Sequence, residues 1–441
     1  TGSDDNAGTA DSPFETVKRA MDEVKAVSAD MQGDIVVHIS EGIHFQDDIL
    51  EFDVEHSGKN GHNVVFEGQD AEKTVISGGK RVSGFEPWDK NPEIYRTRIE
   101  DVTSLREIYV NGEARYRAKS PKMYKGVLAP AEQRNLDFYT RNANAPKDSY
   151  NFYDENTWYK YDGFYMSKSD IGFWKNPEDI EFTWIVEWIP HIMHVDSIEP
   201  VNGDDSIVRI RMNPFFNFMR TQNSNNNAGT PEKYFEISNA LELLDSPGEF
   251  YYDKADKYLY YMPYQNENMV CADVIIPVQD RIMCVIGDDI DKKVENITFK
   301  NMAFAHYTSD VFDITGGSNG QGVGWHYANG RLSHSAIYIE RAKNINFYSN
   351  HFYGIDFACI HMINAVENCE IIGNVFSEIG DMAVVIGSAG HQASDLSEGE
   401  HSTTPPNEDL YTHLIDSETS FKVSFNEQAR YHGWWNSARA L

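Results

Sequence analysis

The chain has 441 residues, of which 41% are hydrophobic and 13% aromatic, so it is long enough to bury a large core. Its 38 Lys and Arg against 69 Asp and Glu give a formal net charge of −31, which argues against nucleic acid, anionic lipid and polyanionic glycans as partners. The four cysteines contain no CxxC pair, which excludes a disulfide scaffold, and no apolar stretch is long enough to span a membrane.

The first predicted element is a helix over residues 11–28. Ser12 suits its N-cap, Pro13 suits the first helical position, and Glu15 stands three residues after Ser12, as in a capping box. Helical spacing also relates the apolar residues Phe14, Val17, Met21 and Val24. Such a stripe must cover apolar surface, for which the open end of a repeat structure is suitable.

Short strands are predicted next, separated by Gly, Ser and Asn and without helices between them. They cover residues 35–39, 63–68, 75–79 and 108–112. Residues 121–264 differ, because they hold Trp158, Trp174, Trp184 and Trp188 together with a polar run at 221–227. We interpret them as an inserted, partly β region with a hairpin formed by residues 250–253 and 258–261.

A nonapeptide repeat follows, at residues 296–304, 344–352 and 368–376. The last two copies start 24 residues apart, which is one coil of a β-solenoid. We therefore predict stacked parallel strands at 295–299, 344–348 and 368–372, with Ile297, Ile345 and Cys369 pointing inward. A Gly-rich loop over residues 305–335 separates the first two copies, and an asparagine ladder at one corner is predicted for Asn301, Asn350 and Asn374.

These elements predict an all-β protein, a right-handed parallel β-helix with an N-terminal capping helix and an aromatic-rich insertion. The expected divisions are residues 1–120, 121–264 and 265–441. Because residues 421–425 begin what resembles another coil shortly before the end at Leu441, we expect a further segment or subunit to cover that end of the solenoid.

Three acids crowd one edge of two adjacent coils, and these are the candidate catalytic residues Asp356, Glu378 and Asp381. A register of 25 residues places Asp356 against Asp381, and a register of 24 places it against Gly380. Paired carboxyl groups of unequal pKa are what glycoside hydrolysis requires, one as acid and one as nucleophile or base. The simpler alternative is that the three are solvated turn residues.

Candidate substrate-binding residues surround these acids: His306, Trp325, His326, His334 and His361. Aromatic faces pack on sugar rings, and His bonds to hydroxyl groups. Glu187, Trp188 and His191 are weaker candidates. The chain contains no phosphate-binding Gly loop, HExxH or GxSxG, so neither a metal site nor a required cofactor is predicted. Residues 4–6 resemble part of a calcium loop, which leaves a structural calcium ion open, although a flexible acidic terminus explains them equally well.

Several blocks resemble the right-handed β-helix glycoside hydrolases, at residues 76–79, 106–115, 244–253 and 373–376. The resemblance is to families 136, 120 and 141, and it implies an exo-acting glycosidase of lacto-N-biosidase or β-xylosidase type. Family 136 has two Asp seven residues apart; Asp381 fits the first, but Ser388 stands at the second. Family 120 has an Asp and a Glu about one coil apart, which fits Asp356 and Glu378.

The resemblance and the charge together predict hydrolysis of a neutral oligosaccharide by an extracellular or cell-surface protein of bacterial type. A polysaccharide lyase on the same fold is the first alternative, but it needs basic residues near its acidic substrate, and Arg331, Arg341 and Lys343 suit charged strand edges better. The second alternative is a non-catalytic glycan-binding solenoid, which needs the aromatic residues but not the acids.

Overall fold

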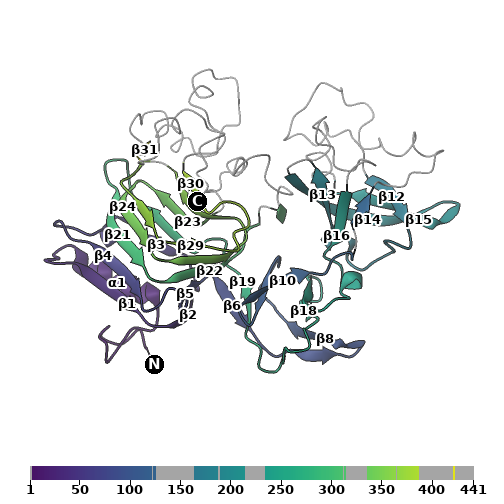
Figure 1. Ribbon diagram of the computed structural model, residues 1–441, viewed down its shortest axis with the longest axis horizontal. Helices are drawn as coiled ribbons and strands as arrows, with labels where there is room; N and C mark the ends of the chain where they lie inside the picture. Colours follow the sequence, from purple (N-terminus) through teal and green to yellow (C-terminus); the bar gives the residue numbers. More distant parts are fainter. Residues whose placement is uncertain are drawn as a thin grey trace, which may run out of the picture. The chain divides into compact units, whose positions relative to one another are not determined.

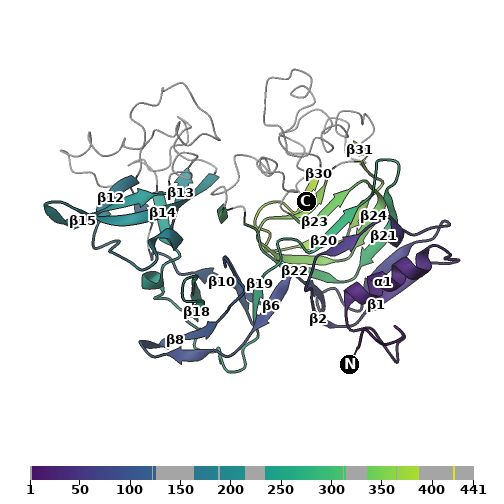
Figure 2. The same cartoon turned by 180° about the vertical axis from the view of Figure 1, so that it is seen from behind.

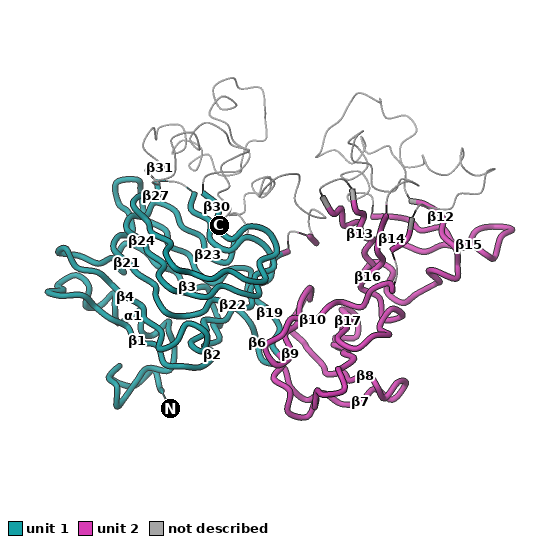
Figure 3. The backbone as a smooth tube through the Cα atoms, in the orientation of Figure 1, with its two compact units in different colours: residues 1–81, 275–309, 321–441 teal, residues 82–274, 310–320 magenta. Residues whose placement is uncertain are grey.

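The computed structural model describes residues 2–121, 123–125, 163–186, 189–213, 234–310, 312–313, 335–363, 365–386 and 421–422. The chain divides into two compact units (Figure 3). Unit 1 comprises Thr1–Arg81, Ile275–Ser309 and Gln321–Leu441, and unit 2 comprises Val82–Val274 and Asp310–Gly320. The strands β6 (Gly79–Val82) and β19 (Val274–Pro277) lie where the chain passes from one unit to the other.

Unit 1 contains three sheets, in which every described strand pair is parallel (Figure 1). The first sheet consists of β1 (Ile35–Ile39), β4 (Val64–Gly68), β21 (Val294–Lys300), β24 (Ala342–Tyr348), β27 (Val366–Glu367), β28 (Glu370–Ile372) and β31 (Phe421–Lys422). The second consists of β2 (Gly42–Phe45), β5 (Thr74–Ser77), β22 (Ala303–Tyr307), β25 (His351–Ile355) and β29 (Val375–Phe376). The third consists of β3 (Leu50–Phe52), β20 (Met283–Ile286), β23 (Ser335–Glu340), β26 (Ala358–Met362) and β30 (Val384–Ile386).

Aromatic side chains from successive strands stack in the core of unit 1. The ring centroids of Phe66 and Phe299 lie 5.6 Å apart, and those of Phe299 and Phe347 lie 5.3 Å apart. In the second sheet Phe304 stacks on Phe352 at 5.2 Å. Parallel strands in register bring identical side chains one strand spacing apart, about 4.8 Å, which is close to the distance that stacked rings prefer. The repeat in the sequence therefore becomes a packed column.

The predicted parallel strands of the repeat are confirmed for β21 and β24, where Ile297 and Ile345 are fully buried. The third copy is interrupted between β27 and β28, and Cys369 lies in this gap, half-buried. Its thiol accepts a hydrogen bond from the Ile345 N–H at 3.4 Å and donates one to the Glu367 carbonyl oxygen. Cys369 therefore lies under Ile345 as expected, but in a turn and not within a strand.

The predicted ladder of Asn301, Asn350 and Asn374 is wrong by one residue. Asn350 and Asn374 do correspond, and the Asn350 Nδ2 donates to Asn374 Oδ1 at 3.1 Å. Asn301 instead corresponds to Ser349, because Lys300 pairs with Tyr348. Both Asn301 and Ser349 are left-handed, with φ of 57° and 54°.

A continuous asparagine ladder occurs at the beginning of the repeat. Asn296, Asn344 and Asn368 all have left-handed φ values, of 59°, 54° and 52°. The Asn344 Nδ2 donates to Asn296 Oδ1 at 2.7 Å, and the Asn296 Nδ2 donates to the Gly58 carbonyl oxygen at 3.0 Å. Asn tolerates this backbone conformation better than other residues with a Cβ. The ladder thus marks a corner that each copy of the repeat turns in the same way.

The helix α1 (Val17–Ser28) is shorter than predicted and packs beside β1 (Figures 1 and 2). Its N-cap is Thr16, whose hydroxyl oxygen accepts from the Arg19 N–H, so the predicted cap at Ser12 is wrong. The Asp4 carboxylate accepts hydrogen bonds from the Glu15 and Thr16 N–H groups, both at 2.9 Å. Residues 13–15 are thereby held outside the helix.

Unit 2 contains two sheets with antiparallel pairs. In the first, the order is β9 (Ile108–Val110), β10 (Glu113–Arg117), β17 (Glu249–Asp253), β18 (Tyr258–Tyr261), β8 (Asn91–Arg98) and β7 (Glu86–Trp88), and only β10 and β17 are parallel within this run. The predicted hairpin is confirmed by the pairing of β17 with β18. The second sheet has the order β11 (Tyr124–Lys125), β16 (Tyr234–Ser238), β13 (Glu181–Val186), β14 (Ile189–Val201), β15 (Asp204–Met212) and β12 (Gly163–Ser167), all antiparallel.

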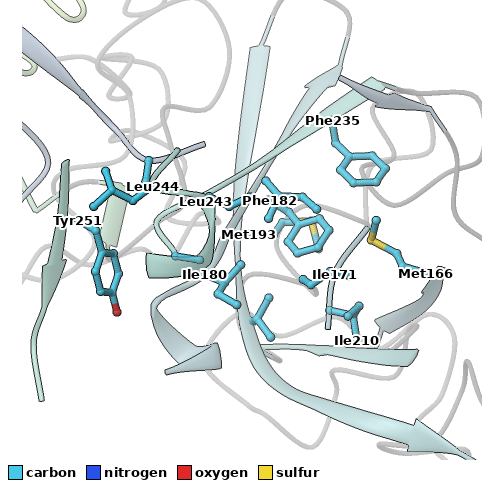
Figure 4. Close-up of a cluster of buried hydrophobic side chains, with 14 of the residues drawn as sticks. Met166, Ile171, Ile180, Phe182, Met193, Ile210, Phe235, Leu243, Leu244 and Tyr251 are labelled. Carbon is cyan, nitrogen blue, oxygen red and sulfur yellow. The ribbon is translucent and has the colours of Figure 1, made fainter. Parts of the chain in front are cut away.

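One face of this second sheet carries the hydrophobic core of unit 2 (Figure 4). Trp184 and Phe235 are fully buried, and their ring centroids lie 4.4 Å apart. Phe182 and Met193 lie on the same face of β13 and β14, since each pairs with the other across the strands. The opposite face of β13 carries Glu181, which becomes important below.

The prediction that the chain is a single right-handed parallel β-helix is wrong, although the all-β class is confirmed. The described strands form five separate sheets, and two of these sheets contain antiparallel pairs. The 24-residue repeat is confined to unit 1, whereas strands in unit 2 are joined by tight hairpins such as Asn202-Gly203. Hairpins of this kind give antiparallel neighbours. The described part also has short 3-10 helices at Val54–His56, Pro177–Asp179 and Leu241–Leu243. Of the helices described, none combines the length and apolarity needed to traverse a bilayer.

Candidate functional site

The register at the end of β25 decides how the predicted acids lie. A bridge between Ile355 and Ile379 sets an offset of 24 residues. The Gly380 N–H donates to the Ile355 carbonyl oxygen at 2.7 Å, and a Cβ added to Gly380 would lie 2.0 Å from the Asp356 carbonyl oxygen. Asp356 therefore stands against Gly380, and the absence of a side chain at Gly380 allows the two backbones to approach.

Glu378 belongs to a column of left-handed residues. His306, Gly354 and Glu378 have φ values of 61°, 60° and 51° and occupy corresponding positions of three neighbouring strands. A left-handed residue with a Cβ costs roughly 1–2 kcal/mol. Because strained residues of this kind gather at functional sites, the column marks the corner before Asp356 as a candidate.

Asp381 lies on the same side, in the segment before β30. Its N–H donates to the Phe357 carbonyl oxygen at 3.2 Å, so it corresponds to Phe357 and not to Asp356. Its side chain is half-buried. Asp381 is thus one strand spacing and one residue from Asp356, whereas Glu378 is one strand spacing and two residues away.

Asp356 is a buried carboxylate, only 8% exposed, that the backbone holds on two sides. Its Oδ2 accepts from the Ser309 N–H at 3.1 Å, and its own N–H donates to the Tyr307 carbonyl oxygen at 3.3 Å. Burial raises the pKa of the Tyr307 phenol, and the nearby charge of Asp356 raises it further. Tyr307 therefore stays protonated next to the acid.

His306 lies at the same corner, buried between polar and aromatic neighbours. Its Nδ1 is 2.8 Å from the Ser77 hydroxyl oxygen, and its ring meets Tyr353 edge-on at 5.7 Å. Burial raises the pKa of Tyr353, and the charge of Glu378 adds to this effect. His306, Tyr353 and Glu378 are therefore brought together on the outer side of the second sheet.

His361 lies on the third sheet, in register with Tyr338, and their rings meet edge-on at 6.2 Å. Next to them is a buried acid that the sequence reasoning missed, Glu340, which is 2% exposed. Its carboxylate accepts from the Tyr338 hydroxyl at 2.8 Å and from Arg341 at 2.7 Å. Arg341 was interpreted as a charged strand edge, but it is the partner of this buried acid. Its only signal in the sequence is an acid ending the otherwise apolar run at 335–340.

Of the predicted site residues, the structure brings Asp356, Glu378, Asp381 and His306 to one corner and places His361 on another sheet. Trp325, His326 and His334 lie outside the described residues, as do Glu187, Trp188, Arg331 and Ser388. His191 is buried opposite Trp184 in unit 2.

Unit 2 holds a second cluster of charged residues, on the polar face of β13 and β14. Glu181 is fully buried, and both of its oxygens accept from Arg117, at 2.8 and 2.5 Å. Arg106 Nη1 donates to Glu181 Oε1 and to Asp313 Oδ1, both at 3.0 Å. The charges of Arg106 and Arg117 overcome the effect of burial and hold the pKa of Glu181 well below its usual range.

The same cluster includes the only group of potential metal ligands found among the described residues. Glu181, His194 and Asp313 each offer a ligand atom, and these atoms lie within 4.8 Å of one another. Burial lowers the pKa of His194, which favours the neutral ring that a metal requires. However, two guanidinium groups already neutralise the carboxylates, and a cation would have to displace them. The cluster therefore fits an ion-pair network and not a metal centre.

No family model matches the sequence, and no curated protein matches it. Among solved structures, one described as "Glycoside hydrolase" is 20% identical with a TM-score of 0.68, and the alignment covers 88% of this chain and 66% of that chain. This chain thus spans just under two thirds of that structure's length. Another, described as "The complex structure of XylC with xylose", is 12% identical with a TM-score of 0.32, covering 88% and 57%. At 20% identity, the first similarity establishes a shared fold and nothing more.

Proposed function

We propose that the protein is a glycoside hydrolase that cleaves a neutral oligosaccharide with Asp356 and one of the two acids on the next strand. The observation that carries this proposal is the buried Asp356 carboxylate beside the left-handed corner of His306 and Glu378. The fold shared with a glycoside hydrolase makes the same reaction class the first to test.

Asp356 suits the ionised role. A backbone N–H donated to a carboxylate stabilises its charged form, and the Ser309 N–H does this at 3.1 Å. Glycosidases need a second carboxyl group that delivers a proton to the leaving oxygen. Asp381 is the nearer partner in the strand register and Glu378 the more distant one. A close pair of carboxyl groups predicts retention of the anomeric configuration, and a wider pair predicts inversion.

The substrate follows from charge. A net charge of −31 repels polyanions, so a neutral sugar chain is favoured over pectate or alginate. Tyr353, half-buried beside Glu378, offers an aromatic face of the kind that packs on sugar rings. Exo-action and a xylosidase-like or lacto-N-biosidase-like specificity are part of the same proposal.

The test is a screen on aryl glycosides and on milk and plant oligosaccharides, followed by the variants Asp356→Asn, Glu378→Gln and Asp381→Asn. Each substitution barely changes shape, so a catalytic carboxylate should lose several orders of magnitude in kcat with little change in Tm. Glu370→Gln is the matched control, because Glu370 is exposed on the first sheet and bonds only to Tyr348 and Asn346 in the described contacts.

The product anomer, followed by NMR, identifies the partner of Asp356. Retention together with loss of activity in Asp381→Asn selects Asp381, and inversion together with loss in Glu378→Gln selects Glu378. Near-normal kcat in all three variants would refute the site. An unsaturated product absorbing in the ultraviolet, formed from a uronate polymer, would refute the hydrolase and favour the lyase.

A further inference from the structure

The chain passes directly from Ser309, in unit 1, to Phe312 and Asp313, which belong to unit 2. Ser309 is the residue whose N–H donates to the Asp356 carboxylate. Phe312 and Asp313 are held by the ion-pair network on β13. Two structural features that are far apart in the sequence are therefore separated by only three or four residues of chain.

Arg106 makes the contacts that hold this piece of chain. Its Nη1 lies 3.0 Å from Asp313 Oδ1, and its guanidinium carbon lies 4.9 Å from the centre of the Phe312 ring. His194 adds a contact from β14, with Nε2 3.5 Å from the Phe312 carbonyl oxygen. Phe312 and Asp313 are thus fixed by their side chains and by the backbone.

Arg106 is itself fixed, because its other partner cannot move. Glu181 is fully buried, and Arg117 binds both of its oxygens. A guanidinium that is 9% exposed and shared between two carboxylates loses little freedom when it forms either bond. The network therefore provides a rigid anchor and not a mobile surface ion pair.

We infer that Arg106 is a positioning residue for the proposed reaction: by anchoring Phe312 and Asp313 it keeps the preceding Ser309 N–H on the Asp356 carboxylate. This inference rests on the proposed function. It also explains why a carboxylate pair and two arginines are buried in a unit that contains none of the proposed catalytic acids. Arg106 acts only through the chain, so it would not touch the substrate.

The main variant is Asp313→Asn, which removes the bond to Arg106 but leaves Arg106 paired with Glu181. The first readout is hydrogen exchange of the Ser309 amide, measured on the peptide that contains it. We expect at least tenfold faster exchange in Asp313→Asn and protection restored in Asp313→Glu, since the carboxylate is kept. The second readout is kcat, which should fall roughly ten- to a hundredfold with KM little changed, because a small misplacement of a catalytic group is costly.

Glu236→Gln is the matched control. Glu236 pairs with Lys119 at 3.2 Å in the same unit, and its side chain is 26% exposed against 23% for Asp313. Its loss should leave both Ser309 exchange and kcat within twofold of the wild type. Tm is measured for every variant, so that a general loss of stability is recognised.

The outcomes separate this inference from the proposed function. If Asp356→Asn is inactive but Asp313→Asn has normal kcat and normal Ser309 protection, the positioning role is refuted and the glycosidase stands. If Asp356→Asn keeps its activity, the proposed site is refuted, and unchanged Ser309 exchange in Asp313→Asn then also refutes the anchor. Equal effects of Asp313→Asn and Glu236→Gln would assign both to general stability.

Discussion

Glu181 is a fully buried carboxylate that remains ionised because Arg106 and Arg117 surround it. Burial alone would raise its pKa, and the two adjacent positive charges lower it well below the usual value of 4.5. A buried ion pair need not stabilise a fold relative to apolar residues, but breaking one partner leaves an uncompensated charge. The removal of the Glu181 charge is therefore a severe change.

We predict that Glu181→Gln lowers the free energy of unfolding by about 3–5 kcal/mol. The folded-state pKa of Glu181 lies below its unfolded value, so its contribution is complete above about pH 4.5 and is lost as the pH falls through the folded-state pKa. Urea unfolding between pH 3 and 7 should show a shallower loss of stability below about pH 4.5 in the variant than in the wild type.

The control for this prediction is Glu199→Gln. Glu199 lies in the same unit, is 38% exposed and pairs with Arg209 at 4.0 Å. A surface pair of this kind contributes about 0–1 kcal/mol. Equal destabilisation by the two substitutions would contradict the buried network.

At this scale, sequence reasoning found single residues better than their partners. Asp356, Glu378 and Asp381 stand close together in the chain, so their proximity was visible. Glu181 bonds to Arg117, Arg106 and Asp313 across 64 to 207 residues of sequence. No local pattern encodes such distances. A charged residue opening the apolar run at 181–186 was the one available signal.

The elements of unit 1 follow from the repeat, but their register does not. Alternating apolar residues predicted β21 and β24, because a strand buries every second side chain. The choice between offsets of 24 and 25 depended on Gly380, which lets the backbone approach Asp356, and composition does not encode that contact. Likewise, Asp4 caps the start of α1 from twelve residues away, so a local capping pattern selected Ser12 wrongly.

We predict that the ladder of Asn296, Asn344 and Asn368 contributes to stability in two separable ways. Asn344→Ala loses a hydrogen bond and forces a residue with a Cβ into a left-handed conformation, which together cost about 2 kcal/mol. Asn344→Gly loses the hydrogen bond but keeps the conformation, so it should cost about 1 kcal/mol.

Urea unfolding monitored by tyrosine and tryptophan fluorescence measures both losses. A larger loss for Asn344→Gly than for Asn344→Ala would contradict the conformational part of the prediction. Losses near zero in both variants would show that the corner does not depend on the asparagine side chain.

At the scale of the whole molecule, composition predicted the all-β class but not the pairing directions. Residues 82–274 are rich in β-formers, as are the strands of unit 1, yet they pair mainly antiparallel. The length of a connection decides this, because parallel neighbours need long crossovers and antiparallel ones need only a hairpin. Propensity is the same in both cases, so the single-solenoid prediction extended the repeat too far.

Net charge is a property of the whole chain, and −31 predicts a salt dependence of stability. Like charges repel more strongly in the compact state, and the screening length falls from about 30 Å at 0.01 M salt to about 8 Å at 0.15 M. We predict that Tm rises by about 2–4 °C over this range. Choline chloride at equal ionic strength should give the same rise, and a Tm that falls with salt would contradict the argument.

The order in which the chain leaves the ribosome has a consequence for unit 1. Val64 of β4 pairs with Ile297 of β21, and 297 minus 64 is 233 residues. At about 5–20 residues per second, β4 waits for roughly 12–47 s before its partner is synthesised. Most of unit 2 emerges during this interval and can complete its own hairpins. The open edge of β4 is meanwhile the part of the nascent chain that most needs protection from intermolecular pairing.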